Sequence, residues 1–150
     1  MEKIYKILEF PAVYRLSQML LAPGRLRLIR NTMIQLLNRF PAGDSVLDIA
    51  CGPRSILEQV GIHPVGVDII ESYIDQYNAN GGRGHVMSAD NLEFENESFT
   101  SVWSIGLIHH LSDEISDRAI KEMVRVCVNG GTVFILDAVM PRYPLSKPWA

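Results

Sequence analysis

The chain has 150 residues and a mass of 16.8 kDa, which is the size of one domain and excludes a two-domain enzyme. Its composition, with 47% hydrophobic and 21% charged residues and a net charge of −3, excludes a disordered or collagen-like chain. No apolar run approaches the roughly 18 residues that span a bilayer. With a charged N-terminus and only two cysteines, we expect a cytoplasmic protein without stable membrane insertion.

The first forty residues differ in charge from the rest of the chain. Residues 1–40 hold seven Lys or Arg against two Glu, whereas residues 41–150 hold seven basic and fifteen acidic residues. Apolar residues at helical spacing predict an amphipathic helix over about 24–39, after a break at Pro23 and Gly24. We therefore expect an N-terminal helical cap at 1–40. A solvated basic face lying against the acidic body is favoured over a lid for an anionic substrate or a membrane-binding surface.

From residue 45 the pattern alternates between strands and helices. Short apolar runs bounded by turn residues predict strands at 45–50, 64–69, 85–89, 99–107 and 132–139. Helical spacing occurs at about 54–60, 71–79 and 113–128, and Asn129-Gly130-Gly131 predicts a glycine cap that ends the last helix. Repeated alternation indicates an α/β fold with a parallel sheet that helices cover on both faces.

Ligands of such sheets bind at the carboxyl ends of the strands, so the residues that follow each strand form the candidate site. A small-residue turn with Gly52 follows the first strand, and Asp68 ends the second. The turn allows a ligand to approach the backbone, and the acidic residue is placed to accept hydrogen bonds from ribose hydroxyls. This combination predicts a nucleoside site, the alternative for Asp68 being a helix-capping or turn role. The chain lacks G-x-G-x-x-G, which leaves a nicotinamide oxidoreductase weakly supported.

Four ordered segments resemble the successive motifs of class I S-adenosylmethionine-dependent methyltransferases, in particular the small-molecule type 11 group. The segments are VLDIACG at 46–52, GVDI at 66–69, ADNLEFENESFTSVWSIGLIHHL at 89–111 and EMVRVCVNGGTVFILD at 122–137. The resemblance covers about 46–139. It implies a Rossmann-like, doubly wound sheet with strand order 3-2-1-4-5, S-adenosyl-L-methionine as cofactor, and methyl transfer as the reaction.

The resemblance also implies the parts of the cofactor site. Asp48 and its turn would hold the methionine portion, Asp68 the ribose, and residues around 88–91 the adenine, while two residues of the fourth strand line the other side. The implied cofactor-binding residues are Asp48, Ala50, Cys51, Gly52, Asp68, Ile69, Ser88, Ala89, Asp90, Ser104 and Ile105. We expect no metal site, because neither cysteine lies in a metal-binding pattern.

The chain departs from the family pattern at several positions. The first motif is usually acidic-x-Gly-x-Gly-x-Gly, but Ala50 replaces its first glycine and Arg54 its third. An arginine side chain can forbid the torsions or the close ligand approach that glycine permits, or it can reach the carboxylate of the cofactor. In the third motif, either Ser88 or Asp90 is the adenine contact. The departure at Arg54 keeps open a second hypothesis, a catalytically inactive binding or interaction module.

Methyl transfer from a sulfonium depends mainly on positioning, so a general base is optional. His109 is the candidate base, ahead of His110, because an imidazole just past the fourth strand can remove a proton from the acceptor. The alternative is that one of these histidines packs on the following helix or caps it. Cys51 is better interpreted as a small residue beneath the turn than as a nucleophile, and Cys127 as a packing residue.

The acceptor is expected to be a small molecule rather than nucleic acid, because the chain is acidic and lacks a basic patch interleaved with aromatic residues. The resembled family has a seven-stranded sheet, whereas this sequence stops after the fifth strand. The domain at 41–150 is therefore expected to be C-terminally truncated relative to the family. An apolar fifth strand with an open edge predicts either that the chain is a fragment or that a second copy covers this edge in a homodimer.

Overall fold

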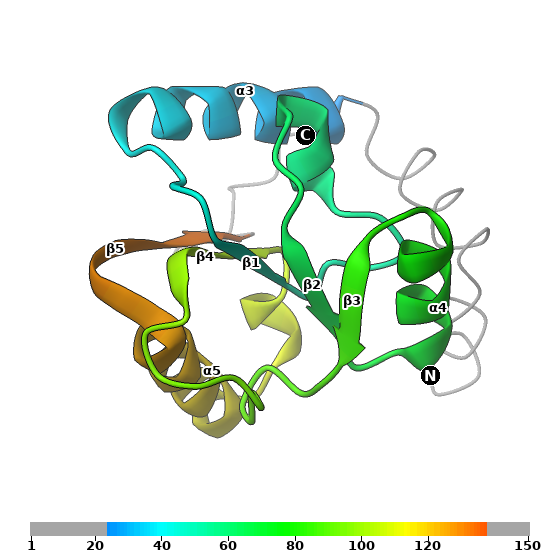
Figure 1. Ribbon diagram of the computed structural model, residues 1–150, viewed down its shortest axis with the longest axis vertical. Helices are drawn as coiled ribbons and strands as arrows, with labels where there is room; N and C mark the ends of the chain where they lie inside the picture. Colours follow the sequence, from blue (N-terminus) through cyan, green and yellow to red (C-terminus); the bar gives the residue numbers. More distant parts are fainter. Residues whose placement is uncertain (1–23, 138–150) are drawn as a thin grey trace, which may run out of the picture.

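The computed structural model describes residues 24–137, and in this range the chain forms a five-stranded parallel sheet with helices on both faces (Figure 1). The strands are β1 (Val46–Ile49), β2 (Val65–Asp68), β3 (Arg83–Val86), β4 (Phe99–Ile105) and β5 (Cys127–Leu136). Their order is β3-β2-β1-β4-β5, and each neighbouring pair is parallel. The predicted fold class and strand order are confirmed.

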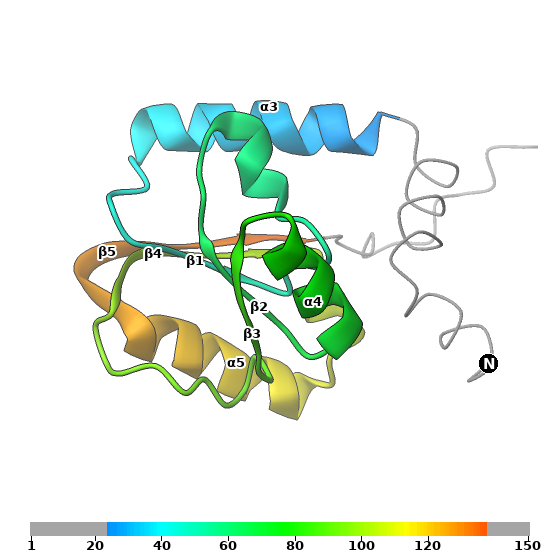
Figure 2. The ribbon, with the colours of Figure 1, turned by 45° about the vertical axis from the view of Figure 1, so that its right-hand side comes forward.

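Helices connect these strands on opposite sides of the sheet. They are α3 (Arg25–Arg39), the 3-10 helix η1 (Ile56–Val60), α4 (Glu71–Ala79), the short 3-10 helix η2 (Ile108–His110) and α5 (Asp113–Val126). Figure 2 shows α3 and η1 above the sheet and α5 below it. The helix predicted at 24–39 is confirmed by α3, while residues 1–23 of the expected cap lie outside the described residues.

Alternation along the strands divides the core into two layers. Leu47 and Ile49 of β1 pack in the cluster that includes the buried face of α5. Their neighbour Val46 points to the other face, where it joins Met33 of α3 and Trp103 of β4. The Trp103 ring is completely buried and stacks on Phe134 with a centroid distance of 3.8 Å. Each side of the sheet is therefore closed by its own apolar layer, and the strand ends remain available for a site.

The glycine cap predicted at Asn129-Gly130-Gly131 is wrong. Helix α5 ends at Val126, and the glycines lie inside β5, where Gly130 has a φ of 80°. The β4–β5 register jumps from Phe99↔Cys127 to Ser101↔Thr132, so residues 128–131 form a bulge. A Cβ at Gly131 would lie 2.7 Å from the carbonyl oxygen of Thr100, so only glycine fits there. Two consecutive glycines are found in β-bulges as well as at the ends of helices, so the sequence pattern alone did not distinguish the two structures.

Other differences between prediction and structure are small. Strand β3 begins two residues before the predicted 85, and β5 begins at Cys127 instead of 132. Cys127 is accordingly the first residue of a strand and not part of the helix, but it is buried in the core as expected. No helix within residues 24–137 is long and apolar enough to cross a membrane.

Candidate functional site

Asp48 is a carboxyl group inside the sheet. Its side chain is 2% exposed, and its Oδ2 accepts a hydrogen bond of 2.6 Å from the Ser55 hydroxyl. Burial raises the pKa of Asp48 to about 7; the Ser55 hydrogen bond opposes this shift, and the nearby carboxylates of Asp68 and Glu58 add to it. A carboxylate this deep in the sheet is costly to ionise, and its one side-chain hydrogen bond from Ser55 only partly offsets that cost.

The turn after β1 brings the chain back across the carboxyl edge of the sheet. Ala50 and Gly52 both adopt left-handed backbone conformations, with φ angles of 61° and 63°. Between them, the Cys51 N–H donates to the Val67 carbonyl at 3.0 Å. The Cys51 side chain is buried against α4, and burial raises its thiol pKa, so the thiol stays protonated and is a poor nucleophile. The left-handed turn leaves the backbone of 50–52 close to the cavity.

Asp68 at the end of β2 fixes this turn. Its Oδ2 accepts the Gly52 N–H at 3.0 Å, and its Oδ1 accepts the Ile70 N–H at 3.0 Å. Each carboxylate oxygen can accept a further hydrogen bond, because an ionised carboxylate offers about four acceptor sites. Burial raises the pKa of Asp68, and hydrogen bonds from the backbone of Ile70, Gly52 and Ile69 oppose that shift. The same carboxylate that orders the turn is thus able to bind a diol.

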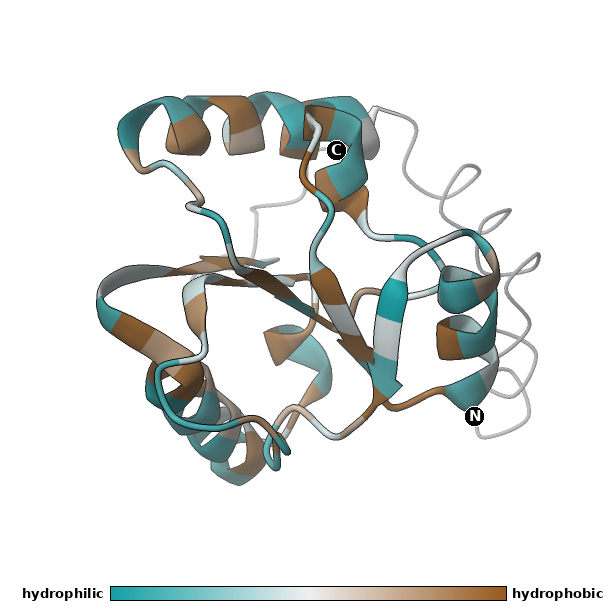
Figure 3. Cartoon of the chain, viewed as in Figure 1, coloured by the Kyte–Doolittle hydropathy of each residue, from teal (hydrophilic) through white to brown (hydrophobic). Residues whose placement is uncertain are grey.

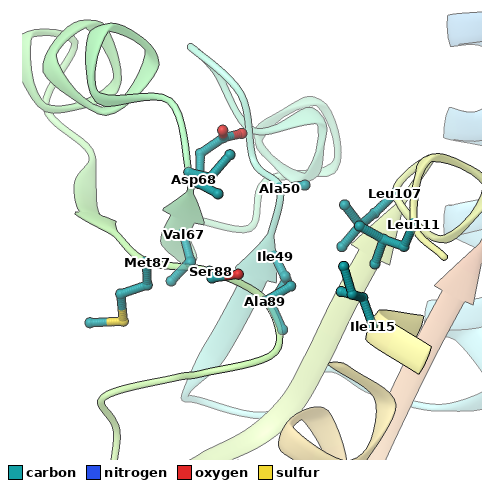
Figure 4. A pocket seen from close by; sticks show the side chains of 11 residues that line it. Ile49, Ala50, Val67, Asp68, Met87, Ser88, Ala89, Leu107, Leu111 and Ile115 are labelled. Atoms are coloured by element: carbon teal, nitrogen blue, oxygen red, sulfur yellow. The ribbon is translucent and has the colours of Figure 1, made fainter. Parts of the chain in front are cut away.

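A cavity of about 130 Å³ opens beside Asp68 at the carboxyl edge of the sheet (Figure 4). Its residues come from the ends of β1 and β2, from the segment after β3, from the two residues that flank η2, and from α5. They are Ile49, Ala50, Val67, Asp68, Ile69, Met87, Ser88, Ala89, Leu107, Leu111 and Ile115. The walls are almost wholly apolar, with Asp68 and Ser88 as the polar side chains. The volume is below the roughly 300–1,000 Å³ of typical sites for whole ligands, so the cavity suits one apolar part of a larger ligand.

Five of the cofactor-binding residues predicted from the sequence line this cavity: Ala50, Asp68, Ile69, Ser88 and Ala89. Gly52 is joined to it through the hydrogen bond with Asp68. The sequence analysis missed the wall formed by Leu107, Leu111 and Ile115. Leu107 and Leu111 flank η2 and Ile115 lies in the first turn of α5, and nothing in the spacing of these residues indicated that they meet a ligand.

The structure separates the two alternatives for the adenine contact. Ser88 lines the cavity, whereas Asp90 does not. Asp90 accepts the Ser88 hydroxyl and two bonds from the Arg118 guanidinium, at 3.1 Å from Nε and 2.9 Å from Nη2. These partners hold the pKa of Asp90 below its usual range. Asp90 therefore ties the segment after β3 to α5, and Ser88 is the better placed of the two to contact a ligand.

The remaining predicted residues lie away from the cavity walls. Ser104 is 1% exposed, and its hydroxyl has no hydrogen-bond partner within the described residues. Ile105 packs in the layer beneath α3. His109 in η2 is held by one carboxylate, since its ring Nδ1 contacts Asp137 Oδ1 and its backbone N–H donates to Asp137 Oδ2 at 3.2 Å. The sequence analysis did not single out Asp137, which follows β5 at the same edge of the sheet.

Arg54 neither fills the turn nor reaches the cavity. Its side chain is 70% exposed and its Nε pairs with Glu58 Oε2 at 2.9 Å. Its φ is not left-handed, so the position does not require glycine. The departure from the glycine pattern at Arg54 is consequently no obstacle to a ligand at this edge.

We expect Arg54→Gly to change the affinity for S-adenosylmethionine by less than about twofold, because the side chain points into solvent. The substitution removes an exposed ion pair and adds backbone entropy, so unfolding free energy should fall by about 1 kcal/mol. Equilibrium binding and urea denaturation measure both quantities. A tenfold change in affinity in either direction would contradict this placement of Arg54.

No group of three or more His, Cys, Asp or Glu residues within 24–137 is arranged to hold a metal ion. The polar groups at the turn and the cavity are the Asp68 carboxylate, the Ser88 hydroxyl and the backbone of the turn, and the two side chains offer hydrogen-bond acceptor oxygens. Such a set recognises an uncharged or cationic organic ligand with hydroxyl groups and an apolar ring, the features of a nucleoside.

Comparison with known proteins agrees with this chemistry. Residues 47–135 match the model of a protein family that is described as "Methyltransferase domain". The human protein named "Probable tRNA methyltransferase 9B" is 37% identical over 103 residues, which are 67% of this chain and 23% of the human protein. The Arabidopsis thaliana tRNA (carboxymethyluridine(34)-5-O)-methyltransferase is 36% identical over 104 residues, 66% of this chain and 25% of that protein. The chain thus spans about a quarter of the length of these curated relatives.

Among solved structures, a complex between the Haloferax volcanii Trm112 methyltransferase activator and a methyltransferase matches with a TM-score of 0.59 and 24% identity. The match covers 75% of this chain and 56% of that one, and it shows a shared fold. The expected exclusion of nucleic acid as acceptor is wrong on these findings, because the relatives are tRNA methyltransferases by name. The prediction excluded nucleic acid because the net charge is negative. That value sums a basic segment at 1–40 and an acidic segment at 41–150. The expected homodimer through the β5 edge stays a prediction.

Proposed function

Because the chain belongs to the class I S-adenosylmethionine-dependent methyltransferase family, we propose that it transfers a methyl group from S-adenosylmethionine to a nucleoside of tRNA. One observation supports the proposal most strongly: Asp68 binds the turn at Gly52 and also lines the apolar cavity at the same edge of the sheet. The tRNA acceptor is supported by the names of the relatives.

The residues present fit the cofactor. The open acceptor sites of Asp68 suit the two ribose hydroxyls, and the apolar walls beyond it suit the adenine ring. Ser88, the other polar side chain of the cavity, donates its hydroxyl hydrogen to Asp90, so its oxygen remains to accept a hydrogen bond from the adenine amino group. The left-handed turn at Ala50 and Gly52 leaves room for the methionine portion beside its backbone. When bound, the cofactor supplies an activated methyl group on a sulfonium, and the protein positions the acceptor and excludes water.

The acceptor chemistry decides whether a base is needed. The name of the Arabidopsis relative specifies an oxygen of a carboxymethyl group on uridine 34 as its acceptor. We propose the same acceptor class for this chain, a carboxylate oxygen on a wobble uridine. A carboxylate is already anionic at neutral pH, so it attacks without a general base. His109, braced by Asp137, is then a residue that orients or neutralises the acceptor carboxylate.

For His109 we expect His109→Ala to lower turnover on tRNA by about tenfold, with little change in cofactor affinity, because His109 does not line the cofactor cavity. His109→Gln keeps a neutral hydrogen-bond donor and separates the two roles. A role in orientation leaves the activity of His109→Gln nearly intact, whereas a general base loses its activity in both variants. Unchanged turnover in His109→Ala would remove this residue from the site.

The proposed function is tested by incubating the chain with S-adenosylmethionine labelled in the methyl group and with tRNA from cells that lack the modification. We expect label in a single nucleoside after digestion, and alkaline hydrolysis should release it if the product is a methyl ester. Label that remains in the cofactor, together with saturable cofactor binding, would indicate the inactive binding module. Label in small molecules of a cell extract but not in tRNA would contradict the tRNA acceptor.

A further inference from the structure

The outer face of α3 carries exposed arginines and no acidic residue. No Asp or Glu occurs between Glu9 and Asp44, while the helix itself carries four arginines. On the helix, Met33 is completely buried, and the exposed side chains lie on the opposite side. Those exposed polar side chains are Arg27, Arg30, Asn31, Gln35, Asn38 and Arg39. Every one of them can donate a hydrogen bond, and none is a carboxylate.

Most arginines of the body are paired with carboxylates, whereas those exposed on α3 are not. Within the described residues, Arg54, Arg118 and Arg125 form ion pairs with carboxylates, and of the body arginines only Arg83 forms none. Arg27 and Arg30 form none, although the body carries a large excess of acidic residues. A solvated basic face was favoured from the sequence, and the structure leaves Arg27 and Arg30 exposed to solvent. Their positive charge is therefore available to an anion outside this chain.

The position of α3 relates this face to the candidate site. The helix crosses the sheet antiparallel to the strands, so its N-terminal end, with Arg27 and Arg30, lies toward the carboxyl edge (Figures 1 and 2). Hydrophobic and hydrophilic residues alternate along α3 (Figure 3), and Ile29, Met33 and Leu36 pack in the apolar layer against the sheet. A long anion that enters the crevice from this side would pass along the outer face of α3.

We propose that the outer face of α3, with Arg27 and Arg30 as its centre, binds the phosphate backbone of the RNA acceptor. The surface supplies the guanidinium and amide donors that hold phosphate oxygens without reading bases. The acidic body repels a polyanion elsewhere, so α3 also sets the direction from which tRNA approaches. This inference rests on the proposed function and gives it a docking surface. An anionic lipid surface is the competing occupant, since Leu28 on the same helix is 69% exposed.

The test compares two double variants that change net charge equally. Arg27→Gln/Arg30→Gln removes two charges from α3, and Arg83→Gln/Lys121→Gln removes two exposed charges from β3 and α5. Binding of each full-length chain to unmodified tRNA is measured by fluorescence anisotropy at several salt concentrations. We expect the α3 double variant to lose about tenfold in affinity, with a salt slope shallower by about one unit per arginine. The control double variant should change affinity by less than about twofold.

Two further measurements separate the outcomes. Arg27→Lys/Arg30→Lys should restore the salt slope, because phosphate contacts need charge more than the planar guanidinium. Equal RNA affinities for the two Gln double variants would overturn the docking surface, as would wild-type binding to vesicles with anionic lipid but not to tRNA. If α3 controls tRNA binding but no nucleoside is methylated, the proposed function fails and the surface stands. If tRNA is methylated equally by wild type and by the α3 double variant, only the surface fails.

Discussion

Asp68→Asn is expected to weaken S-adenosylmethionine binding by at least thirtyfold. The carboxylate holds the Gly52 N–H and the Ile70 N–H, and its free acceptor sites are those we assign to the ribose. An Asn amide replaces one acceptor oxygen by a donor, which would face either a backbone N–H or a ribose hydroxyl. Losing hydrogen bonds to a charged group costs about 1.5–3 kcal/mol each, or about ten- to 150-fold in affinity. Equilibrium dialysis with labelled cofactor measures the loss.

Asp75→Asn is the matched control, because it makes the same charge change at an exposed position of α4. It should leave the affinity for the cofactor within twofold of wild type. The circular dichroism of Asp68→Asn should remain that of a folded protein, since Asp68 ends β2 at the edge of the sheet and does not belong to an apolar core cluster. Wild-type affinity in a folded Asp68→Asn would show that the ligand does not use this carboxylate.

The second large effect concerns Asp48 and the dependence of stability on pH. Its pKa is about 7 in the folded chain against 3.8 in an unfolded one, so the folded state binds the extra proton between these values. Unfolding free energy therefore falls as the pH rises from about 4 to about 7, by about 4 kcal/mol in total. We expect Asp48→Asn to remove most of this fall, because its amide stays neutral and its oxygen can still accept the Ser55 hydroxyl.

Urea denaturation at pH 5 and pH 7.5 tests this expectation. The carboxylates of Asp90 and Glu122, whose pKa values are lowered by partners that include Arg118 and Arg125, act in the opposite direction but only at lower pH. The raised pKa of Asp68 adds to the effect of Asp48, so some slope should persist in the variant. If wild type and Asp48→Asn show the same change in unfolding free energy, Asp48 is ionised at low cost in the folded chain.

The fold was predictable because its signals are local and repeat. Apolar strand-length runs and helical spacing located all five strands, and the alternation of elements required a parallel sheet. The failure at Gly130 and Gly131 has a tertiary cause. Their conformation is set by the close approach of Thr100 on β4, and sequence spacing carries no information on that contact.

The site was only partly predictable for the same reason. Asp68 and the Gly52 turn were found because they follow strands directly, and the fold brings all strand ends to one edge. Their direct hydrogen bond, the diversion of Asp90 to Arg118, and the bracing of His109 by Asp137 all join residues at least 16 positions apart. The prediction that excluded nucleic acid was wrong because it used the net charge of the whole chain. The net charge does not show that α3 carries four arginines while residues 41–150 are acidic.

Equilibrium dialysis of the chain against methyl-labelled S-adenosylmethionine, with the Asp68→Asn and Asp75→Asn variants beside it, tests most directly whether the carboxyl edge is a cofactor site. We predict one saturable equivalent at micromolar concentration for wild type and Asp75→Asn, and none in that range for a folded Asp68→Asn. Absence of saturable binding by folded wild-type chain up to millimolar cofactor would contradict the site, as would equal binding by all three chains.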